Sequence, residues 1–390
     1  MFDIEKCIRC GTCLENCPVI DLNIDQAKEE IENLINGSSF IVNECTTCGT
    51  CDFNCPNNLT PSDLIKELKR ARIKELDEDD KIPRSNKFIF PFNKPNVFDF
   101  YEKVLMSPEE KKNLEEWKSP SKSEELVLLG CSISYFMQHL YKNLTLESLL
   151  KGKTFAGGID FCCGEVYYRT CMPIPKVDIE DHLYSKFSDL GVKKLIIFCN
   201  ECYEAYKKEY KRISADFEIV SMWEYIAKAI ENGDLKITKK LNFKVAFHDA
   251  CVVKKYPELL DYPRKIVEAT GCDIIELEHN RENALCCGFS LGLLDQKLLD
   301  KIRKKRFKEI KKTNTKYLIN TCPGCISTFS LDYKIQMNKY KVLSVLELLR
   351  MSCGEEIDEF KNVKVFNGIL NKSMELARER KLSKQKVNAH

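Results

Sequence analysis

Four cysteines lie close to the start of the chain, in the stretch Cys7-Ile8-Arg9-Cys10-Gly11-Thr12-Cys13-Leu14-Glu15-Asn16-Cys17-Pro18. The same spacing returns in Cys45-x-x-Cys48-x-x-Cys51-x-x-x-Cys55-Pro56. Three thiolates at three-residue intervals wrap one face of an iron-sulfur cubane, and the fourth cysteine of such a run reaches a second cluster. The two runs therefore predict two interlocked 4Fe-4S cubanes near the N-terminus.

The ligand sets follow from this exchange of the fourth cysteine between two runs of the bacterial ferredoxin type. Zinc, the alternative metal, uses pairs of cysteines at C-x-x-C spacing and not four-cysteine runs that end in proline. Helical spacing over 24–34, ending at Asn36-Gly37, predicts a helix between the runs, and Thr60-Pro61-Ser62-Asp63 predicts the start of another. We assign one cluster to Cys7, Cys10, Cys13 and Cys55, and the other to Cys45, Cys48, Cys51 and Cys17.

The cysteines also divide the chain, because eight precede Pro56, none lies between Asn57 and Gly130, and thirteen follow. Within the gap, residues 77–123 hold an acidic run, five prolines and several phenylalanines. These indicate a connecting strap whose aromatic side chains pack across neighbouring domains or, alternatively, form a docking strip for a partner. We expect a two-cluster ferredoxin-type domain (1–76), the strap (77–123), two cysteine-rich domains (124–240 and 241–352) and a basic tail (353–390).

The region after the strap repeats itself. Its three cysteine motifs return at offsets of 120, 124 and 123 residues. This near-constant spacing indicates a duplicated unit of about 120 residues, and therefore two similar sites related by pseudo-symmetry. The first unit holds Cys131, Cys162-Cys163-Gly164 and Cys199-x-x-Cys202; the second holds Cys251, Cys286-Cys287-Gly288 and Cys322-x-x-Cys325.

Short apolar runs precede these cysteines and predict buried strands at 126–129, 195–198, 245–247 and 317–319. Stretches with helical spacing, such as 222–230 and 302–310, alternate with the strands, so each unit is predicted to contain a parallel sheet. Ligands of open parallel sheets bind beyond the carboxyl ends of the strands, where these cysteines fall. We expect a multidomain α+β and α/β protein: a helical ferredoxin-like module followed by two pseudo-symmetric α/β cysteine-rich domains.

The paired motifs resemble the cysteine-rich domains of heterodisulfide reductase. Together with the two-cluster module, they resemble its form in which the iron-sulfur and catalytic subunits are fused, over roughly 1–72 and 124–352. The resemblance implies that each five-cysteine set binds a non-cubane 4Fe-4S cluster, and that a disulfide between the two clusters is reduced in two one-electron steps. In that family the disulfide joins coenzyme M and coenzyme B of methanogenic archaea. The implied catalytic cysteines are Cys131, Cys162, Cys163, Cys199, Cys202, Cys251, Cys286, Cys287, Cys322 and Cys325.

An electron-transfer role is the alternative. Relatives that serve flavin dehydrogenases, such as glycolate oxidase or thiol:fumarate reductase iron-sulfur subunits, often have one degraded motif, whereas both sets are complete here. Completeness favours a disulfide-reducing enzyme of methanogenesis over a non-catalytic subunit of a flavin-dependent dehydrogenase. No Gly-x-Gly-x-x-Gly follows a predicted strand, so we expect no flavin or nucleotide site. A flavoprotein, a hydrogenase-type subunit or another electron donor must then supply the electrons.

Composition and charge limit the kinds of partner and the location that we expect for this protein. The 61 basic and 59 acidic residues give a net charge of +2, which provides no bulk reason to expect nucleic acid as a partner. No apolar run approaches the roughly 18 residues that span a bilayer, and no secretory signal precedes Cys7. We expect a cytoplasmic protein that reaches a membrane only through a partner subunit, because clustered cysteines in a reducing compartment bind metal.

Several single residues outside the cluster motifs carry predictions of their own. His248, three residues before Cys251, is a candidate proton donor to a leaving thiolate, with a hydrogen-bonded structural histidine as the alternative. Arg169, Lys254 and Lys255 are candidates for attracting an anionic substrate, with a solvated surface position as the default. We expect Cys171, Cys272 and Cys353 to be buried small apolar residues, and the basic tail 378–386 to be an exposed helix end or a docking peptide.

Overall fold

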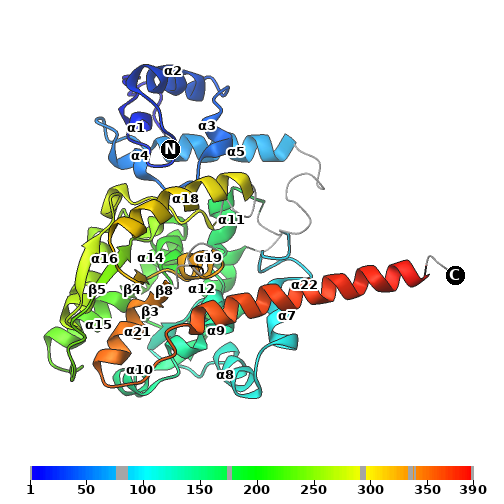
Figure 1. Cartoon of the computed structure of the whole chain (residues 1–390), viewed down its shortest axis with the longest axis vertical. Coiled ribbons are helices and arrows are strands. Elements are labelled where there is room, and N and C mark those ends of the chain that lie inside the picture. The colour runs from blue at the N-terminus through cyan, green and yellow to red at the C-terminus, as the bar shows by residue number, and fades with distance from the viewer. Residues whose placement is uncertain are drawn as a thin grey trace.

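The computed structural model of the chain describes residues 2–75, 87–173, 178–289, 296–332, 337 and 340–387. A helical N-terminal module lies on one end of a larger α/β body, and a long C-terminal helix projects from that body (Figure 1). Part of the predicted strap, 77–86, falls outside the described residues.

The N-terminal module consists of short helices around the two cysteine runs. The predicted helix between the runs is α2, whose first turn is closed by a capping box in which the Asn23 side chain accepts from the backbone N–H of Gln26. Gly37 follows its end with φ of 78°, a left-handed conformation that glycine adopts without strain. The helices are α1 (Thr12–Glu15), α2 (Ile24–Ile35), α3 (Ile41–Glu44), α4 (Thr50–Phe53) and α5 (Pro61–Glu75).

The described part of the strap forms two helices, α7 (Val97–Val104) and α8 (Pro108–Lys118). Its aromatic side chains pack on the first cysteine-rich unit: the Phe90 and Tyr167 ring centroids are 5.0 Å apart, and those of Phe98 and Tyr135 are 5.2 Å apart. The strap's aromatic side chains therefore pack on a neighbouring domain, in the manner of the first of the two alternatives above.

The first cysteine-rich unit contains a four-stranded parallel sheet in the order β2-β1-β3-β4. The two central strands are apolar and almost completely buried because helices cover both faces. The elements are β1 (Glu125–Leu128), α9 (Cys131–Phe136), η1 (Gln138–Leu140), α10 (Leu144–Leu149), β2 (Thr154–Ala156), η2 (Ile159–Phe161), α11 (Glu165–Thr170), α12 (Ile179–Asp189), β3 (Lys194–Ile197), α13 (Asn200–Glu204), η3 (Ala205–Glu209), α14 (Lys211–Asp216), β4 (Glu218–Ser221) and α15 (Met222–Glu231).

The second unit repeats this topology. Its sheet has the order β6-β5-β7-β8, again all parallel, so each strand has a counterpart in the first sheet. The predicted pair of parallel sheets is therefore confirmed. The elements are β5 (Lys244–His248), η4 (Cys251–Val253), α16 (Pro257–Ala269), β6 (Asp273–Glu276), η5 (Arg281–Asn283), α18 (Gln296–Lys312), β7 (Tyr317–Asn320), α19 (Pro323–Ser330), β8 (Lys341–Ser344) and α21 (Val345–Ser352).

The two units share one hydrophobic core, which runs through both sheets and includes α15 and α16, packed against each other. The N-terminal module has its own core, and α18 supplies Leu298 and Ile302 to it. Helix α18 is therefore one of the elements of the second unit on which the module lies (Figure 1).

The last helix, α22 (Lys361–Val387), begins against β8 and α19 and then leaves the body. Phe366 packs near Phe136, whereas Leu370 and Met374, further along, are exposed. The predicted basic segment 378–386 lies on this projecting helix (Figure 1). Among the described residues, none of the helices combines the length and apolarity that crossing a membrane requires.

Candidate functional site

The first expected cubane set is brought together in the N-terminal module. Cys7, Cys10, Cys13 and Cys55 line one small cavity, although Cys55 comes from the other run. Burial, followed by the charges of Cys55, Cys10 and Cys7, raises the pKa of the Cys13 thiol to about 12. A cation is the natural partner for four thiols held this closely, because ionising them without one would place like charges side by side.

The second expected set also converges. Cys17 interacts electrostatically with Cys48, and Cys51 interacts with Cys45, Cys48 and Cys17. The backbone N–H of Thr47 donates to Cys45 Sγ at 3.2 Å, a contact of the kind that tunes the potential of a cluster. The structure thus groups the eight cysteines as the exchange of fourth cysteines between the runs requires.

The five cysteines of the first unit form a continuous series at the carboxyl end of its sheet. The Sγ atoms of Cys131 and Cys162 lie 3.4 Å apart. Cys162 contacts Cys163, which contacts Cys202, and Cys202 contacts Cys199. Cys131 is half-buried and the other four are buried.

The second unit reproduces this series at the equivalent positions. The Sγ atoms of Cys251 and Cys286 lie 3.6 Å apart. The contacts then pass from Cys286 through Cys287 and Cys325 to Cys322. Cys251, the counterpart of Cys131, is again the half-buried member. Equal order and equal burial indicate that both sets are built for the same kind of group.

Local backbone structure explains the convergence. Each C-x-x-C begins a helix, with Cys199 and Cys322 as the residues before α13 and α19. The backbone N–H groups of Gly164 and Gly288 donate to Cys162 and Cys286 Sγ at 3.4 and 3.3 Å. Exposed helix N–H groups and amide-to-sulfur hydrogen bonds both favour anionic sulfur. Buried cysteines surrounded by such donors are suited to act as thiolate ligands of an iron-sulfur cluster.

The second five-cysteine set lies next to the N-terminal module. Cys286 interacts electrostatically with Cys48, the second cysteine of the second ferredoxin-type run. Between the two five-cysteine sets, Cys199 interacts with Cys322. Asn200, the residue after Cys199, donates from Nδ2 to Thr321 Oγ1 at 2.9 Å, and its Oδ1 accepts from Trp223 Nε1 at 2.8 Å. The second set therefore lies next to both the N-terminal module and the first set.

Two basic residues stand where the module meets the second set. Arg169 interacts with Cys251 and Cys286 across the two units, and Lys254 hydrogen-bonds Thr50 and the carbonyl of Ala284. Burial opposes ionisation of Cys48, but the Lys254 ammonium and hydrogen bonds from Thr50 and Thr46 outweigh it and lower the pKa of that thiol to about 7. Arg169 and Lys254 are 6% and 1% exposed, so the default prediction of a solvated surface position was wrong for both.

Arg169 and Lys254 can be buried because acidic and carbonyl groups around them accept their hydrogen bonds. Arg169 donates to the Thr47 carbonyl at 3.0 Å and lies 3.4 Å from a Glu204 carboxylate oxygen. Lys255 is partly exposed and pairs with Asp52 at 2.7 Å. Thr47 and Thr50 were missed by the sequence reasoning, since a threonine inside a cysteine run carries no pattern of its own.

His248 is 1% exposed and ends β5, with a ring nitrogen, Cys287 Sγ and Cys325 Sγ all within 4.8 Å of one another. Neither ring nitrogen has a hydrogen-bond partner among the described residues. Burial lowers the pKa of the ring well below its ordinary value. A buried polar ring without a partner fits a group bound beside Cys287.

The three remaining cysteines lie apart from these sets. Cys171 and Cys272 are each 3% exposed, as predicted for small apolar residues. Cys353 is only half-buried, because it caps the exposed end of α21, so the prediction was wrong for this residue.

Comparison with known proteins supports these assignments at the level of domains. A 4Fe-4S dicluster domain matches residues 1–77, and a cysteine-rich domain matches residues 245–330. Over 261 residues the chain is 26% identical to a subunit of the dihydromethanophenazine:CoB–CoM heterodisulfide reductase of Methanosarcina mazei, covering 61% of this chain and 63% of that protein. Over this shared stretch the chain is similar to a heterodisulfide reductase subunit. The expected resemblance is thereby confirmed.

The chain is also similar to iron-sulfur proteins with other names. It is 28% identical over 241 residues to EtfAB:quinone oxidoreductase of Syntrophomonas wolfei, which covers 58% of this chain and 34% of that protein. It is 27% identical over 240 residues to a subunit of the fumarate reductase (CoM/CoB) of Methanothermobacter marburgensis, covering 58% and 46%. The chain thus spans from about a third to less than two thirds of these relatives. Two of the three named relatives are subunits of multi-subunit oxidoreductases.

Proposed function

We propose that this iron-sulfur oxidoreductase-like protein reduces a small disulfide between two non-cubane clusters, held by the two five-cysteine sets and supplied by two cubanes in the N-terminal module. The observation that carries the proposal is the presence of two complete sets with the same order of contacts, near enough for Cys199 and Cys322 to interact electrostatically. Iron-sulfur clusters supply one-electron storage and transfer when bound.

The reaction is balanced as the addition of two electrons and two protons to a disulfide, which breaks the S–S bond and yields two thiols. A partner protein supplies the electrons. The chain's own residues bind the clusters through cysteine, and Arg169 and Lys254 place positive charge beside the second set. That charge favours an added electron and an anionic substrate. His248 is the buried ring available beside Cys287.

The test uses anaerobically purified, fully metallated protein with reduced methyl viologen as the electron source. We expect oxidation of the dye on addition of the coenzyme M and coenzyme B disulfide, with two thiols formed per two electrons. A C325S variant should lose thiol formation but keep dye-dependent reduction of the cubanes. Failure to cleave this and other small disulfides, with the clusters in place, would overturn the proposal.

A second candidate is an electron-transfer protein that exchanges electrons with a separate flavoprotein. The similarity to EtfAB:quinone oxidoreductase and to the fumarate reductase of Methanothermobacter marburgensis favours this candidate. Purification from the source cells discriminates the two. A stoichiometric flavin dehydrogenase whose substrate reduces these clusters, together with no disulfide cleavage, would establish the second candidate in place of the first.

A further inference from the structure

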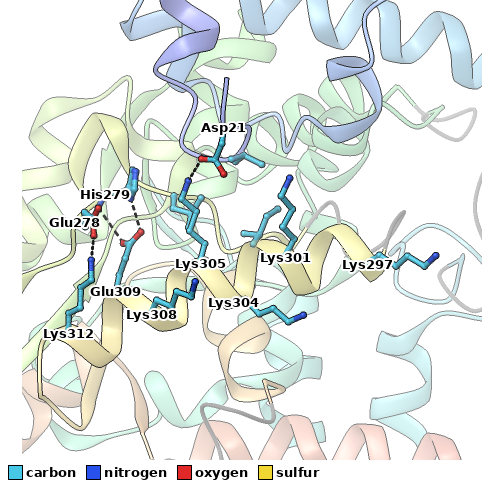
Figure 2. Close-up of a pocket in the computed structure, with 13 residues that line it drawn as sticks. Asp21, Glu278, His279, Lys297, Lys301, Lys304, Lys305, Lys308, Glu309 and Lys312 are labelled. Atoms are coloured by element: carbon cyan, nitrogen blue, oxygen red, sulfur yellow. Dashed lines mark hydrogen bonds and ion pairs between the residues drawn. The ribbon is translucent and has the colours of Figure 1, made fainter. Parts of the chain in front are cut away.

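Helix α18 carries a strip of lysines on its outer side, between Cys287 and Cys322 in the sequence. A groove of about 550 Å³ lies along this helix and is bounded by the N-terminal module on one side. Figure 2 shows the lysine side chains spaced along α18, with Asp21 of the module facing Lys305. The lysines that line the groove are Lys297, Lys301, Lys304, Lys305, Lys308 and Lys312.

The groove has an excess of positive charge. Its three acids are already paired: Asp21 with Lys305 at 2.9 Å, Glu278 with Lys312 at 2.6 Å, and Glu309 with Arg306 and His279 at 2.7 Å. Lys304 and Lys308 are exposed and have no ion-pair partner in the part of the chain that the structure describes. The strip is therefore able to attract a negatively charged partner.

The inner side of the same helix lies against the cysteine sites. A Cβ added to Gly288, the residue after Cys287, would lie only 2.7 Å from Leu299 of α18. The groove is also lined by Leu285, the residue before Cys286, and by Val19, two residues after Cys17. One helix, about 10 Å across, thus separates the lysine strip from cysteines of both the second ferredoxin-type set and the second five-cysteine set.

We propose that the lysine strip of α18 is the docking surface for an acidic electron-donor protein. This inference rests on the proposed function in one respect, since both candidates above require an external donor. The strip from Lys297 to Lys312 extends about 22 Å at 1.5 Å per residue, which is too long for one small anion and suits the face of a small redox protein. A donor bound there faces the point where the module meets the second set.

The experiment measures reduction of the clusters, without any disulfide present, in the full metallated chain. The probe is a reduced acidic ferredoxin, mixed rapidly with wild-type protein and with the K304E/K308E variant at several salt concentrations. Wild-type cluster reduction should slow steeply as salt rises, because steering between opposite charges is screened. At low salt the variant should react at least tenfold more slowly and show little dependence on salt.

Two comparisons make the result specific. The K111E/K112E variant changes two exposed lysines on α8, far from the groove, and should react like wild type. Reduced methyl viologen, a small cation, should reduce the clusters of all three proteins without loss of rate in K304E/K308E, which shows that its clusters are intact. Titration of oxidised ferredoxin should give correspondingly weaker binding to K304E/K308E, independently of any electron transfer.

Equal ferredoxin rates in wild type and K304E/K308E would overturn the proposal, as would equal slowing in K111E/K112E. Tighter binding of phosphatidylglycerol vesicles than of ferredoxin, lost in K304E/K308E, would assign the strip to a membrane surface and would also overturn it. A chain that fails to cleave disulfides but shows the expected ferredoxin rates would disprove the proposed reaction while supporting the docking surface.

Discussion

Arg169 and Thr47 exchange two hydrogen bonds across the boundary between the first cysteine-rich unit and the N-terminal module. The Arg169 guanidinium donates to the Thr47 carbonyl at 3.0 Å, and the Thr47 hydroxyl donates to the Arg169 carbonyl at 3.0 Å. Residues 122 positions apart are thereby fixed to each other. The same arginine interacts electrostatically with Cys251 and Cys286 of the second unit, so it interacts with all three cysteine-bearing parts of the chain.

Replacing this arginine tests its role. Arg169→Gln leaves Glu165 and Glu204 buried without their cation, and breaking a buried pair in this way costs roughly 3 kcal/mol of unfolding free energy. Loss of the positive charge should also lower the reduction potential of the nearest cluster. Urea unfolding and a potentiometric titration measure the two effects. Arg212→Gln, which removes an exposed pair with Asp181, serves as the control, with a cost below about 1 kcal/mol.

Iron content tests the assignment of the cysteines. Four clusters give about sixteen irons per chain, and Cys48→Ser should remove about four of them because serine is a poor ligand for a 4Fe-4S cubane. Cys272→Ser is the control, since Cys272 is also buried but belongs to none of the sets. Iron analysis and EPR of anaerobic samples give the measurement. A total near eight irons in wild type would confine the clusters to the N-terminal module.

A single methyl group distinguishes the two units beside their five-cysteine sets. Gly130 has φ of 76°, and a Cβ there would lie 3.0 Å from Cys199 Cβ and 3.3 Å from Cys202 Sγ. Gly130→Ala should therefore disturb the first five-cysteine set and lower iron content by up to about four atoms. The second unit has Ala250 at this place, with an ordinary φ of −69°. Ala250→Gly should keep its iron, and an equal loss in both variants would contradict the explanation.

Stability should depend on pH through Glu347. Burial raises the pKa of this carboxyl from 4.5 to about 7, although Ser344 and Asn362 donate hydrogen bonds to it. The folded chain therefore holds the proton more tightly than the unfolded chain. Its contribution to stability is complete below pH 4.5 and is lost as the pH rises to about 7, a change of about 3 kcal/mol.

Comparison with Glu347→Gln isolates this contribution, because glutamine keeps the hydrogen-bonding shape without titrating. The unfolding free energies of the two proteins are measured in urea between pH 5.5 and 8. The difference between them should change as the pH rises and should become constant above about pH 7. Parallel pH profiles in the two proteins would show that Glu347 is ionised throughout.

The sequence predicted the central strands of both sheets and missed every edge strand. Strands β1, β3, β5 and β7 are apolar runs buried on both faces, which is a pattern that sequence reveals. The edge strand β6 has no fully buried residue, and β2 has one, so neither carries a continuous apolar signal. The cysteines were found by spacing alone, whereas the burial of Arg169 and Lys254 depends on partners far away in the chain.

The hydrogen bond from Asn200 to Thr321 makes each of the two repeated units depend on the other. Asn200 is 2% exposed and satisfied on one side by Trp223 of its own unit and on the other by Thr321 of the second unit. Either unit produced alone would lose half of this arrangement and uncover the common core. Two copies of an ancestral domain have become mutually dependent, so neither is expected to survive as an independent protein.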